Sequence, residues 1–289
     1  MIYFPPAKIN LGLKILGKRE DGFHEIQSLF LPINWCDVLE IIVVENGEWG
    51  KLNFTCSGIK IPEDNSSNTV VRAHKLLSKN FKLPEIDAQL LKTIPTGAGL
   101  GGGSSDGSFM LKAINELCQL GVSNKALKSL ASELGSDCPF FIDNKPSLVT
   151  GRGEIIDPLP FSIEELKINE LSILLIHPGL HVNTGIAFTL LNQELSNKKL
   201  QFLKLASLPL NQWKEALHND LQIPVASRHP EIFNAINILE DTHAEYVQMT
   251  GSGSSVFGLY QTRNHDEDLI KTAIKKAKKL GFTTYFGAL

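Results

Sequence analysis

The sequence lacks the features that mark membrane, secreted and zinc-binding proteins. Its longest apolar runs, such as residues 171–176, are far shorter than the roughly 20 residues that span a bilayer. The chain does not open with a basic patch and a long apolar stretch, so no secretory signal is expected. Cys36, Cys56, Cys118 and Cys138 form no CxxC pair, which argues against a zinc site and indicates a reducing compartment. We therefore expect a cytoplasmic protein without membrane association.

The sequence also has no strong excess of charge of either sign. Its 28 Lys and Arg residues are balanced by 31 Asp and Glu residues, for a formal net charge of −3. No global basic field favours nucleic acid or an anionic membrane as a partner. Hydrophobic residues make up 43% of the 289 residues, which excludes wholesale disorder. At about 100–200 residues per domain, this length indicates two domains or one large one.

Strand and helix patterns are mixed along the chain, which favours the α+β class. Alternating apolar residues predict a strand over residues 9–15. Further strands are expected at 25–33, 38–44, 52–55, 86–94, 171–177, 245–249, 255–260 and 283–286, and helices at 68–81, 104–120, 125–134 and 266–280. The lysines of the last helix lie opposite an apolar stripe, which predicts a solvated face rather than an RNA surface. An acidic, proline-containing stretch at 158–165 predicts two domains, 1–160 and 161–289.

A glycine-rich run at residues 95–106 is the most informative segment. It reads Pro-Thr-Gly-Ala-Gly-Leu-Gly-Gly-Gly-Ser-Ser-Asp. Five glycines in seven residues cost conformational entropy unless the backbone must adopt shapes that other residues forbid. A predicted helix follows, and its first turn offers unpaired N–H groups and the positive end of the helix dipole. The run therefore predicts a loop that binds phosphate through backbone donors, with Ser104 and Ser105 near phosphate oxygens or Mg²⁺.

Other patterns overlap the same run. A flexible linker or an ordinary glycine turn is disfavoured by the leucine inside it and by strong structure on both sides. Residues 97–102 match G-x-G-x-x-G, but the βαβ unit and the acidic residue of a dinucleotide site do not follow. Residues 103–107 match G-x-S-x-G, with Ser105 as nucleophile and Asp137 and His177 in hydrolase order, yet no strand is expected to run directly into this serine. The GxxxxGK[ST] motif is absent, so ATP would be bound without a Walker lysine.

Three segments, in order, resemble the signature regions of the GHMP kinase superfamily, which includes galacto-, homoserine and mevalonate kinases. They are PAKINLGL at 6–13, the glycine run, and MTGSGSSVFG at 249–258. Within the superfamily, REDGFHEIQSLF at 19–30 and LGSDCPFF at 134–141 resemble kinases that act on a diphosphocytidyl alcohol in non-mevalonate isoprenoid synthesis. The resemblance implies a two-domain fold, with a ribosomal-protein-like N-terminal domain and a ferredoxin-like C-terminal domain.

The same resemblance implies phosphorylation of the 2-hydroxyl of a cytidyl diphosphate substrate by ATP and Mg²⁺. Phosphoryl transfer needs in-line geometry and charge neutralisation. Asp137 matches the catalytic aspartate, which would accept or orient the proton of the hydroxyl. Lys8 matches the partner lysine, which would hold Asp137 ionised and place positive charge beside the phosphate. Taken alone, Lys8 reads as an exposed strand residue and Asp137 as a helix N-cap.

Binding residues are implied position by position. Phe23, where the family often has Tyr, and Phe188 would stack on the cytosine, and His24 would hydrogen bond to it. The substrate-binding candidates are Asn10, Phe23, His24, Thr184 and Phe188. The ATP-binding candidates are Asn68, Lys92, Pro95, Thr96, Gly97, Ala98, Gly99, Leu100, Gly101, Gly102, Gly103, Ser104 and Ser105. Gly107 stands where the family commonly has Ala, which weakens the helix start by up to ~1 kcal/mol.

No HExxH, His/Cys cluster or carboxylate pair predicts a tightly bound metal, so Mg²⁺ would arrive largely with ATP. A small-molecule substrate is the expected partner, and the chain is expected to be a monomer or a homodimer. Three alternatives stay open: a homoserine or mevalonate type of GHMP kinase, a serine hydrolase using Ser105, and a non-catalytic nucleotide-binding module.

Overall fold

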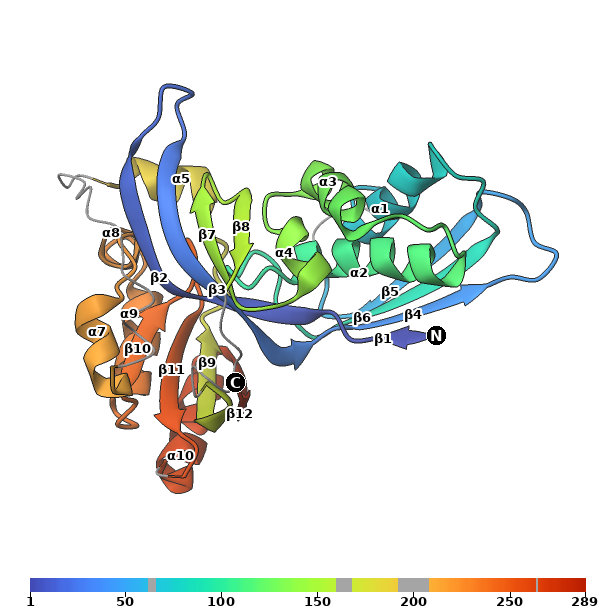
Figure 1. Cartoon of the computed structure of the whole chain (residues 1–289). Coiled ribbons are helices and arrows are strands. Elements are labelled where there is room, and N and C mark those ends of the chain that lie inside the picture. The colour runs from blue at the N-terminus through green and yellow to red at the C-terminus, as the bar shows by residue number, and fades with distance from the viewer. Residues whose placement is uncertain (62–65, 160–167, 192–207, 264) are drawn as a thin grey trace. The chain divides into compact units, whose positions relative to one another are not determined.

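The periodicities of the sequence correspond to strands and helices in the computed structural model (Figure 1). The structure describes residues 1–61, 66–159, 168–191, 208–263 and 265–289. The described strands are β1 (Ile2–Tyr3), β2 (Pro6–Lys18), β3 (His24–Cys36), β4 (Val38–Val43), β5 (Leu52–Gly58), β6 (Ile86–Lys92), β7 (Ser147–Gly151), β8 (Ile155–Pro158), β9 (Leu171–His177), β10 (Tyr246–Met249), β11 (Val256–Gln261) and β12 (Thr283–Ala288). The described helices are α1 (Thr69–Ser78), α2 (Gly102–Leu117), α3 (Asn124–Leu134), α4 (Cys138–Asp143), α5 (Thr184–Thr189), α7 (Trp213–Ala216), α8 (Gln222–Ala226), α9 (Pro230–Glu240) and α10 (Glu267–Lys279).

The contacts within the chain define two units. Unit 1 comprises Met1–Ala7, Trp35–Thr96 and Gly101–Lys145, and unit 2 comprises Lys8–Asn34, Gly97–Leu100 and Pro146–Leu289. These units do not coincide with the expected segments 1–160 and 161–289. Strand β3 pairs with β7, with Ile26 opposite Gly151, and β7 pairs with β8, so residues 24–34 of β3 lie in unit 2 with these two strands. The expected boundary at 158–165 lies mostly outside the described residues.

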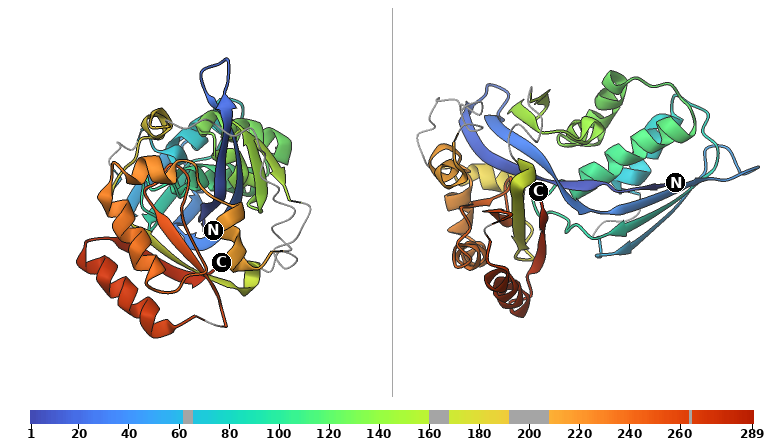
Figure 2. Two further views of the ribbon diagram at one scale, coloured as in Figure 1. Left: turned by 90° about the vertical axis from the view of Figure 1, so that its left-hand side faces the viewer. Right: turned by 60° about the horizontal axis from the view of Figure 1, so that its bottom comes forward.

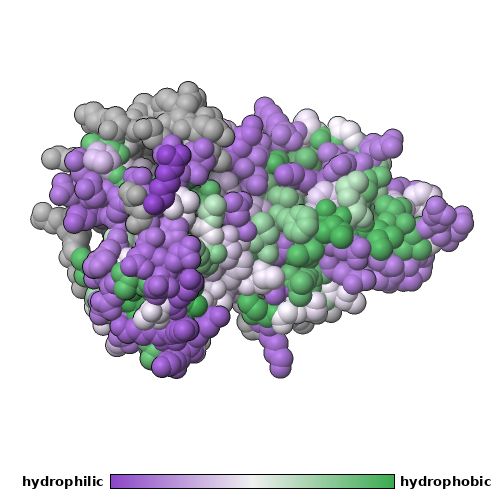
Figure 3. All heavy atoms as spheres, turned by 90° about the horizontal axis from the view of Figure 1, so that it is seen from below, coloured by the Kyte–Doolittle hydropathy of each residue, from purple (hydrophilic) through white to green (hydrophobic). Residues whose placement is uncertain are grey.

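Unit 1 is a sheet with helices on one face. Its strand order is β1-β4-β6-β5, in which β5 runs parallel to β6 and the other neighbours are antiparallel. Helices α1 to α4 lie on one side of this sheet (Figure 1). The core between them contains apolar residues such as Leu39, Leu90, Val70 and Ile114. Seen from below, apolar surface gathers over this unit (Figure 3). Leu91 of β6 is one of the exposed large hydrophobic residues of the unit.

Helices α1 and α2 pack closely, and this explains the glycine inside α2. A Cβ at Gly107 would lie 3.0 Å from Thr69 Cβ and 3.2 Å from Leu134 Cδ1. An alanine would force neighbouring atoms to move, because contacts at this distance are tighter than ordinary van der Waals contact. The lower helix propensity of glycine is therefore offset by the close approach of the two helices.

Unit 2 contains two antiparallel sheets, with strand orders β10-β11-β9-β12 and β2-β3-β7-β8. All seven residues of β9 are buried, as expected for a central strand that reads as a continuous apolar run. Helices α9 and α10 pack against the first sheet (Figure 2), with Ile232 and Ile270 in a common core with Leu174. The lysines of α10 are exposed, which confirms the expected solvated face. Among the described residues, no helix combines the length and apolar content that crossing a membrane requires.

Candidate active site

The C-terminal part of the glycine run forms the start of α2 in unit 1. The N-cap, Gly101, has a left-handed backbone (φ 71°), and no side chain caps the helix. The Ser105 N–H donates to the Gly101 carbonyl at 2.9 Å, so the N–H groups of residues 102–104 precede this helical bond in the chain. The Ser105 hydroxyl is fully buried and has no hydrogen-bond partner in the part of the chain that the structure describes. Uncapped amides and a buried hydroxyl at the positive end of a 16-residue helix are suited to a phosphate group.

Lys92 lies in a buried ion-pair cluster beneath this helix start. Its Nζ pairs with Asp37 and, at 2.7 Å, with Asp106 Oδ2, and its side chain is only 1% exposed. Asp37 also accepts the N–H groups of Thr93 (2.6 Å) and Ile94 (2.9 Å). Burial raises the pKa of Asp106 above its ordinary value, an effect that Lys92 opposes. The predicted nucleotide contact of Lys92 stays a prediction, and the structure uses its ammonium to neutralise carboxylates.

Asn68, another predicted nucleotide contact, caps α1. Its Oδ1 accepts the Val70 N–H at 2.9 Å, and the neighbouring Thr69 hydroxyl donates to the Gly103 carbonyl at 2.6 Å. This second bond ties the start of α1 to the glycine run. Asn68 is thus close in sequence to a residue that holds the run, while its own carbonyl oxygen is used for helix capping.

Asp137 occupies the N-cap position of α4 but does not cap it. Its backbone is already helical (φ −83°, ψ −15°), and its side chain makes no cap bond. The expected N-cap position of this aspartate is confirmed, but its side chain does not form the capping hydrogen bond. The segment packs against α2, because the Ser108 hydroxyl donates to the Cys138 carbonyl at 2.7 Å and a Cβ at Gly135 would lie 3.9 Å from Ser104 Oγ. Unit 1 thus brings the Asp137 segment to the first turns of α2.

Lys8 is held in unit 2, where its backbone is attached to the glycine run. Its N–H donates to the carbonyl of Leu100 at 2.9 Å, and Leu100 directly precedes Gly101 in the chain. The residue is 3% exposed, so it is not an exposed strand lysine. Its Nζ donates to Asn10 Oδ1 at 2.7 Å and lies 4.4 Å from the centroid of the Phe30 ring. The lysine is thereby presented in a fixed position rather than as a mobile surface charge.

The first part of the glycine run, 97–100, packs against the third signature segment. Gly99 has φ 77°, and a Cβ there would lie 2.6 Å from the carbonyl oxygen of Thr250. Only glycine combines this backbone conformation with so close an approach. Asn219 Nδ2 in turn donates to the carbonyls of Met249 (2.8 Å) and Gly251 (2.7 Å). The third segment therefore lies directly against this part of the loop.

The candidates for the cytosine pocket are only partly brought together. The His24 and Phe188 rings stack, with centroids 4.9 Å apart and planes 15° apart. Phe23 is 54% exposed, and the Arg152 guanidinium lies 4.8 Å above its ring. Thr184 Oγ1 lies 3.0 Å from Ser252 Oγ of the third segment. Burial lowers the pKa of His24, with a further contribution from Lys18, so its imidazole is neutral near pH 7.

The structure does not support the hydrolase alternative. The strand before the glycine run ends at Lys92, so no strand runs directly into Ser105. His177 is buried in unit 2, where its Nδ1 lies 3.3 Å from Ser254 Oγ and 3.2 Å from Ser255 Oγ. Burial lowers the pKa of His177 to about 4. The Nδ1 atom of His177 is already occupied, because the hydroxyls of Ser254 and Ser255 contact it.

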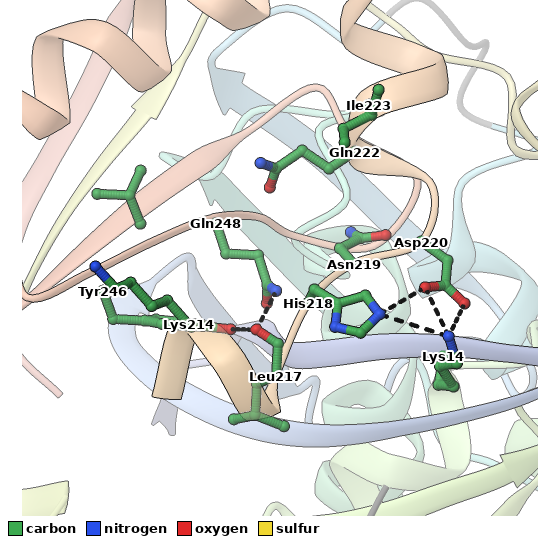
Figure 4. Close-up of a pocket in the computed structure, with 11 residues that line it drawn as sticks. Lys14, Lys214, Leu217, His218, Asn219, Asp220, Gln222, Ile223, Tyr246 and Gln248 are labelled. Carbon is green, nitrogen blue, oxygen red and sulfur yellow. Dashed lines mark hydrogen bonds and ion pairs between the residues drawn. The ribbon is translucent and has the colours of Figure 1, made fainter. Parts of the chain in front are cut away.

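Unit 2 also contains a cavity of about 310 Å³ that no predicted site residue lines (Figure 4). Three of its titratable residues contact one another, because Lys14 Nζ and His218 Nε2 lie 3.2 Å and 3.1 Å from Asp220 oxygens. Gln248 donates to the Leu217 carbonyl at 3.3 Å and accepts the Gly12 N–H at 2.8 Å. Several polar groups of this cavity are thus used in contacts within unit 2.

The residues present fit a metal ion that arrives with the nucleotide. Within the described ranges, no group of three His, Cys, Asp or Glu residues could hold a metal ion. Mg²⁺ bound to a triphosphate keeps several waters and needs few protein ligands. The unpartnered hydroxyl of Ser105 at the helix start is one suitable oxygen.

Comparison with known proteins defines the class. The GHMP kinases N terminal domain matches residues 68–145, and the GHMP kinases C terminal domain matches residues 204–281. A homoserine kinase structure from Cytophaga hutchinsonii superposes with a TM-score of 0.64 at 18% identity, covering 98% of this chain and 93% of that one, and shares the fold. The chain belongs to the GHMP kinases, which are ATP-dependent small-molecule kinases.

Proteins with higher sequence identity to this chain identify its family within the GHMP kinases. Relatives from Azobacteroides pseudotrichonymphae and Parabacteroides distasonis are 42% and 39% identical, over 90% and 92% of this chain and 94% and 93% of theirs. Both are named 4-diphosphocytidyl-2-C-methyl-D-erythritol kinase. A crystal structure of 4-(cytidine 5'-diphospho)-2C-methyl-D-erythritol kinase superposes with a TM-score of 0.82 at 29% identity, covering 99% of this chain and 98% of that one. Among the GHMP kinases, this is the family into which the chain falls.

Proposed function

We propose that this chain transfers the γ-phosphoryl group of ATP to the 2-hydroxyl of 4-diphosphocytidyl-2-C-methyl-D-erythritol, in isoprenoid precursor synthesis by the non-mevalonate route. The observation that carries the phosphoryl-transfer part is the uncapped start of α2, with its left-handed Gly101 and buried Ser105 hydroxyl. The names of the relatives support the choice of acceptor. The protein is proposed to act in the cytoplasm as a monomer or homodimer, on a small molecule and without nucleic acid or membrane.

Lys8 and Asp137 are the proposed catalytic residues. The amides of the α2 start bind the phosphates, and Mg²⁺ arriving with ATP supplies additional charge neutralisation. Asp137 accepts or orients the proton of the attacking hydroxyl, and the packing of its segment against the start of α2 supports this role. Lys8 supplies positive charge beside the transferring group, and its attachment to Leu100 supports this placement along the loop.

The acceptor is proposed to contact unit 2. Neutral His24 can offer one ring nitrogen, as donor or acceptor, to the pairing edge of cytosine, and Phe188, whose ring stacks on His24, is proposed to supply an aromatic face. Phe23, exposed on the same hairpin, is proposed as the second face. Asn10 and Thr184 are the remaining proposed substrate contacts.

An ATP-consumption assay with three acceptors tests this function. The cytidyl alcohol, homoserine and mevalonate are compared, and turnover is expected with the cytidyl alcohol only. The Asp137→Ala variant is expected to lose at least 10³-fold in kcat while its Kd for ATP changes less than threefold. The matched control is Asp143→Asn at the other end of α4, where the carboxylate pairs with Lys128. Turnover of homoserine or mevalonate, or ATP-independent activity abolished by Ser105→Ala, would contradict the proposal.

A further inference from the structure

The Asn10 side chain lies in a buried polar network in the middle of β2. The residue is 2% exposed, and both the oxygen and the nitrogen of its carboxamide form hydrogen bonds. Nδ2 donates to Ser28 Oγ at 2.9 Å, while Oδ1 accepts from Lys8 Nζ at 2.7 Å and from Thr250 Oγ1 at 3.1 Å. The backbone N–H of Asn10 also donates to Thr250 Oγ1, at 3.0 Å. The network therefore connects the proposed catalytic lysine to two hydroxyl groups, both fully buried.

The orientation of the Asn10 carboxamide follows from one carbonyl group, that of Gly12. The Gly12 carbonyl can only accept, and the Ser28 hydroxyl donates its single proton to it at 2.6 Å. Toward Asn10, Ser28 can therefore only accept, so the NH₂ of the carboxamide must face Ser28. The carbonyl oxygen of Asn10 must then face Lys8, where an ammonium requires an acceptor. Ser28 thus decides which way the carboxamide is turned.

Residues behind β2 hold the backbone of Gly12 at its N–H group. The Gly12 N–H donates to Gln248 Oε1 at 2.8 Å, and Gln248 is anchored by its bond to the Leu217 carbonyl at the wall of the cavity in Figure 4. Thr250 acts from the other side, since it accepts from the backbone of Asn10 and donates to its side chain. Both ends of the network are therefore anchored by backbone groups that cannot reverse their polarity.

We infer that Ser28 and Thr250 are positioning residues, which fix the orientation of the Asn10 carboxamide and through it the ammonium of Lys8. The inference rests on the proposed function, because it assigns them a role through a proposed catalytic residue. With the carboxamide reversed, an NH₂ group would face the ammonium and the lysine would lose its acceptor. Removal of either hydroxyl is expected to lower kcat by misplacing a charge that is needed at the transferring phosphate.

The test compares variants that keep or lose a hydroxyl. Ser28→Ala and the nearly isosteric Thr250→Val are expected to lower kcat about 10- to 100-fold with the cytidyl alcohol. Thr250→Ser keeps the hydroxyl and is expected to recover kcat to within threefold of the unmodified chain. The KM for ATP is expected to change less than threefold in Ser28→Ala, because Ser28 contacts Asn10 and Gly12 in this network rather than the loop. The matched control is Ser172→Ala, a buried serine that contacts Thr262 in the same unit.

A double-mutant cycle with Lys8→Met distinguishes a role of Ser28 in positioning Lys8 from a loss of kcat caused by a general structural disturbance. If Ser28 acts through Lys8, Ser28→Ala costs nothing further in the Lys8→Met background. An equal loss in both backgrounds, or full kcat in Ser28→Ala and Thr250→Val, overturns the inference while the proposed function stands. If Lys8→Met itself retains full kcat, the proposed catalytic role of Lys8 fails first. Urea unfolding of each variant verifies that the compared proteins are folded.

Discussion

Replacing Lys92 by methionine is expected to destabilise the protein strongly in the absence of any nucleotide. The substitution keeps a linear side chain of similar length in the core of unit 1 but removes the ammonium that lies between Asp37 and Asp106. Asp37 would keep its hydrogen bonds from the N–H groups of Thr93 and Ile94. Most of the lost free energy of unfolding would therefore come from Asp106, whose charge would be left without compensation. One Asp106 oxygen already has no hydrogen-bond partner among the described residues.

The magnitude follows from the burial of all three groups. Removing one partner of a buried ion pair typically costs about 3–5 kcal/mol, because a charge is left without compensation. This is a large share of the ~5–15 kcal/mol that stabilises an ordinary domain. The matched control is Lys128→Met on α3, whose pair with Asp143 is one-third exposed and should contribute less than about 1 kcal/mol.

The loss is expected to depend on pH in a defined direction. Burial holds the pKa of Asp106 above its value in the unfolded chain, and removal of Lys92 raises that pKa further. Between the unfolded and folded pKa values the folded state binds more protons, so the free energy of unfolding falls as the pH rises through this interval. Lys92→Met should therefore be more strongly destabilised at pH 8 than at pH 6. The added substitution Asp106→Asn should recover stability at pH 8, since it removes the uncompensated charge.

Urea unfolding monitored by circular dichroism, without ATP, measures these differences. A loss of less than about 1 kcal/mol in Lys92→Met, together with a large rise in the KM for ATP, would refute the reasoning. That result would mean that the lysine contacts the nucleotide rather than neutralising the core. A large loss of stability without a pH dependence would contradict the assignment of the cost to Asp106.

Two further predictions concern unit 2. Burial lowers the pKa of His177 to about 4, so the unfolded state binds the extra proton and stability falls as the pH drops below about 6.5; between pH 7 and pH 5 the loss is about 2 kcal/mol. Urea unfolding at both pH values should show this loss in the unmodified chain and in His243→Asn, an exposed control, but not in His177→Asn. Phe188→Ala should raise the KM for the cytidyl alcohol about tenfold with little change in kcat, because one stacked aromatic contact contributes about 0.5–1.5 kcal/mol. Steady-state kinetics beside the exposed control Phe233→Ala check this, and an unchanged KM would argue against a stacking role.

Local patterns were sufficient for most elements of this fold. The apolar run of β9, the amphipathic stripe of α10 and the glycine run before α2 each act within a few residues of the chain, so their periodicity identifies them. The alternation in β6 also predicts that Lys92 is buried. Ile86, Ala88 and Leu90 are buried and alternate with exposed or half-buried residues, and Lys92 is the next residue of the buried series.

The partners across the fold could not be found in the same way. Nothing in the sequence pairs Lys92 with Asp37, which is 55 residues away, or Asn10 with Thr250, which is 240 residues away. The pairing of β3 with β7, which places residues 8–34 in unit 2, has no local signature either. Such contacts depend on which strands become neighbours, and period-2 or period-3.6 patterns carry no information about that choice.

By itself, then, the sequence determined the α+β class and the glycine-rich loop before α2, because glycine content and short-range periodicity act on the backbone directly, while the signature motifs carried the GHMP kinase resemblance. Tertiary structure alone decided that Asp137 leaves its helix uncapped, that Lys92 is neutralised in the core, and that Ser28 turns the Asn10 carboxamide toward Lys8. The physical reason is that a hydrogen bond or ion pair is set by the distance and polarity of groups that only folding brings together.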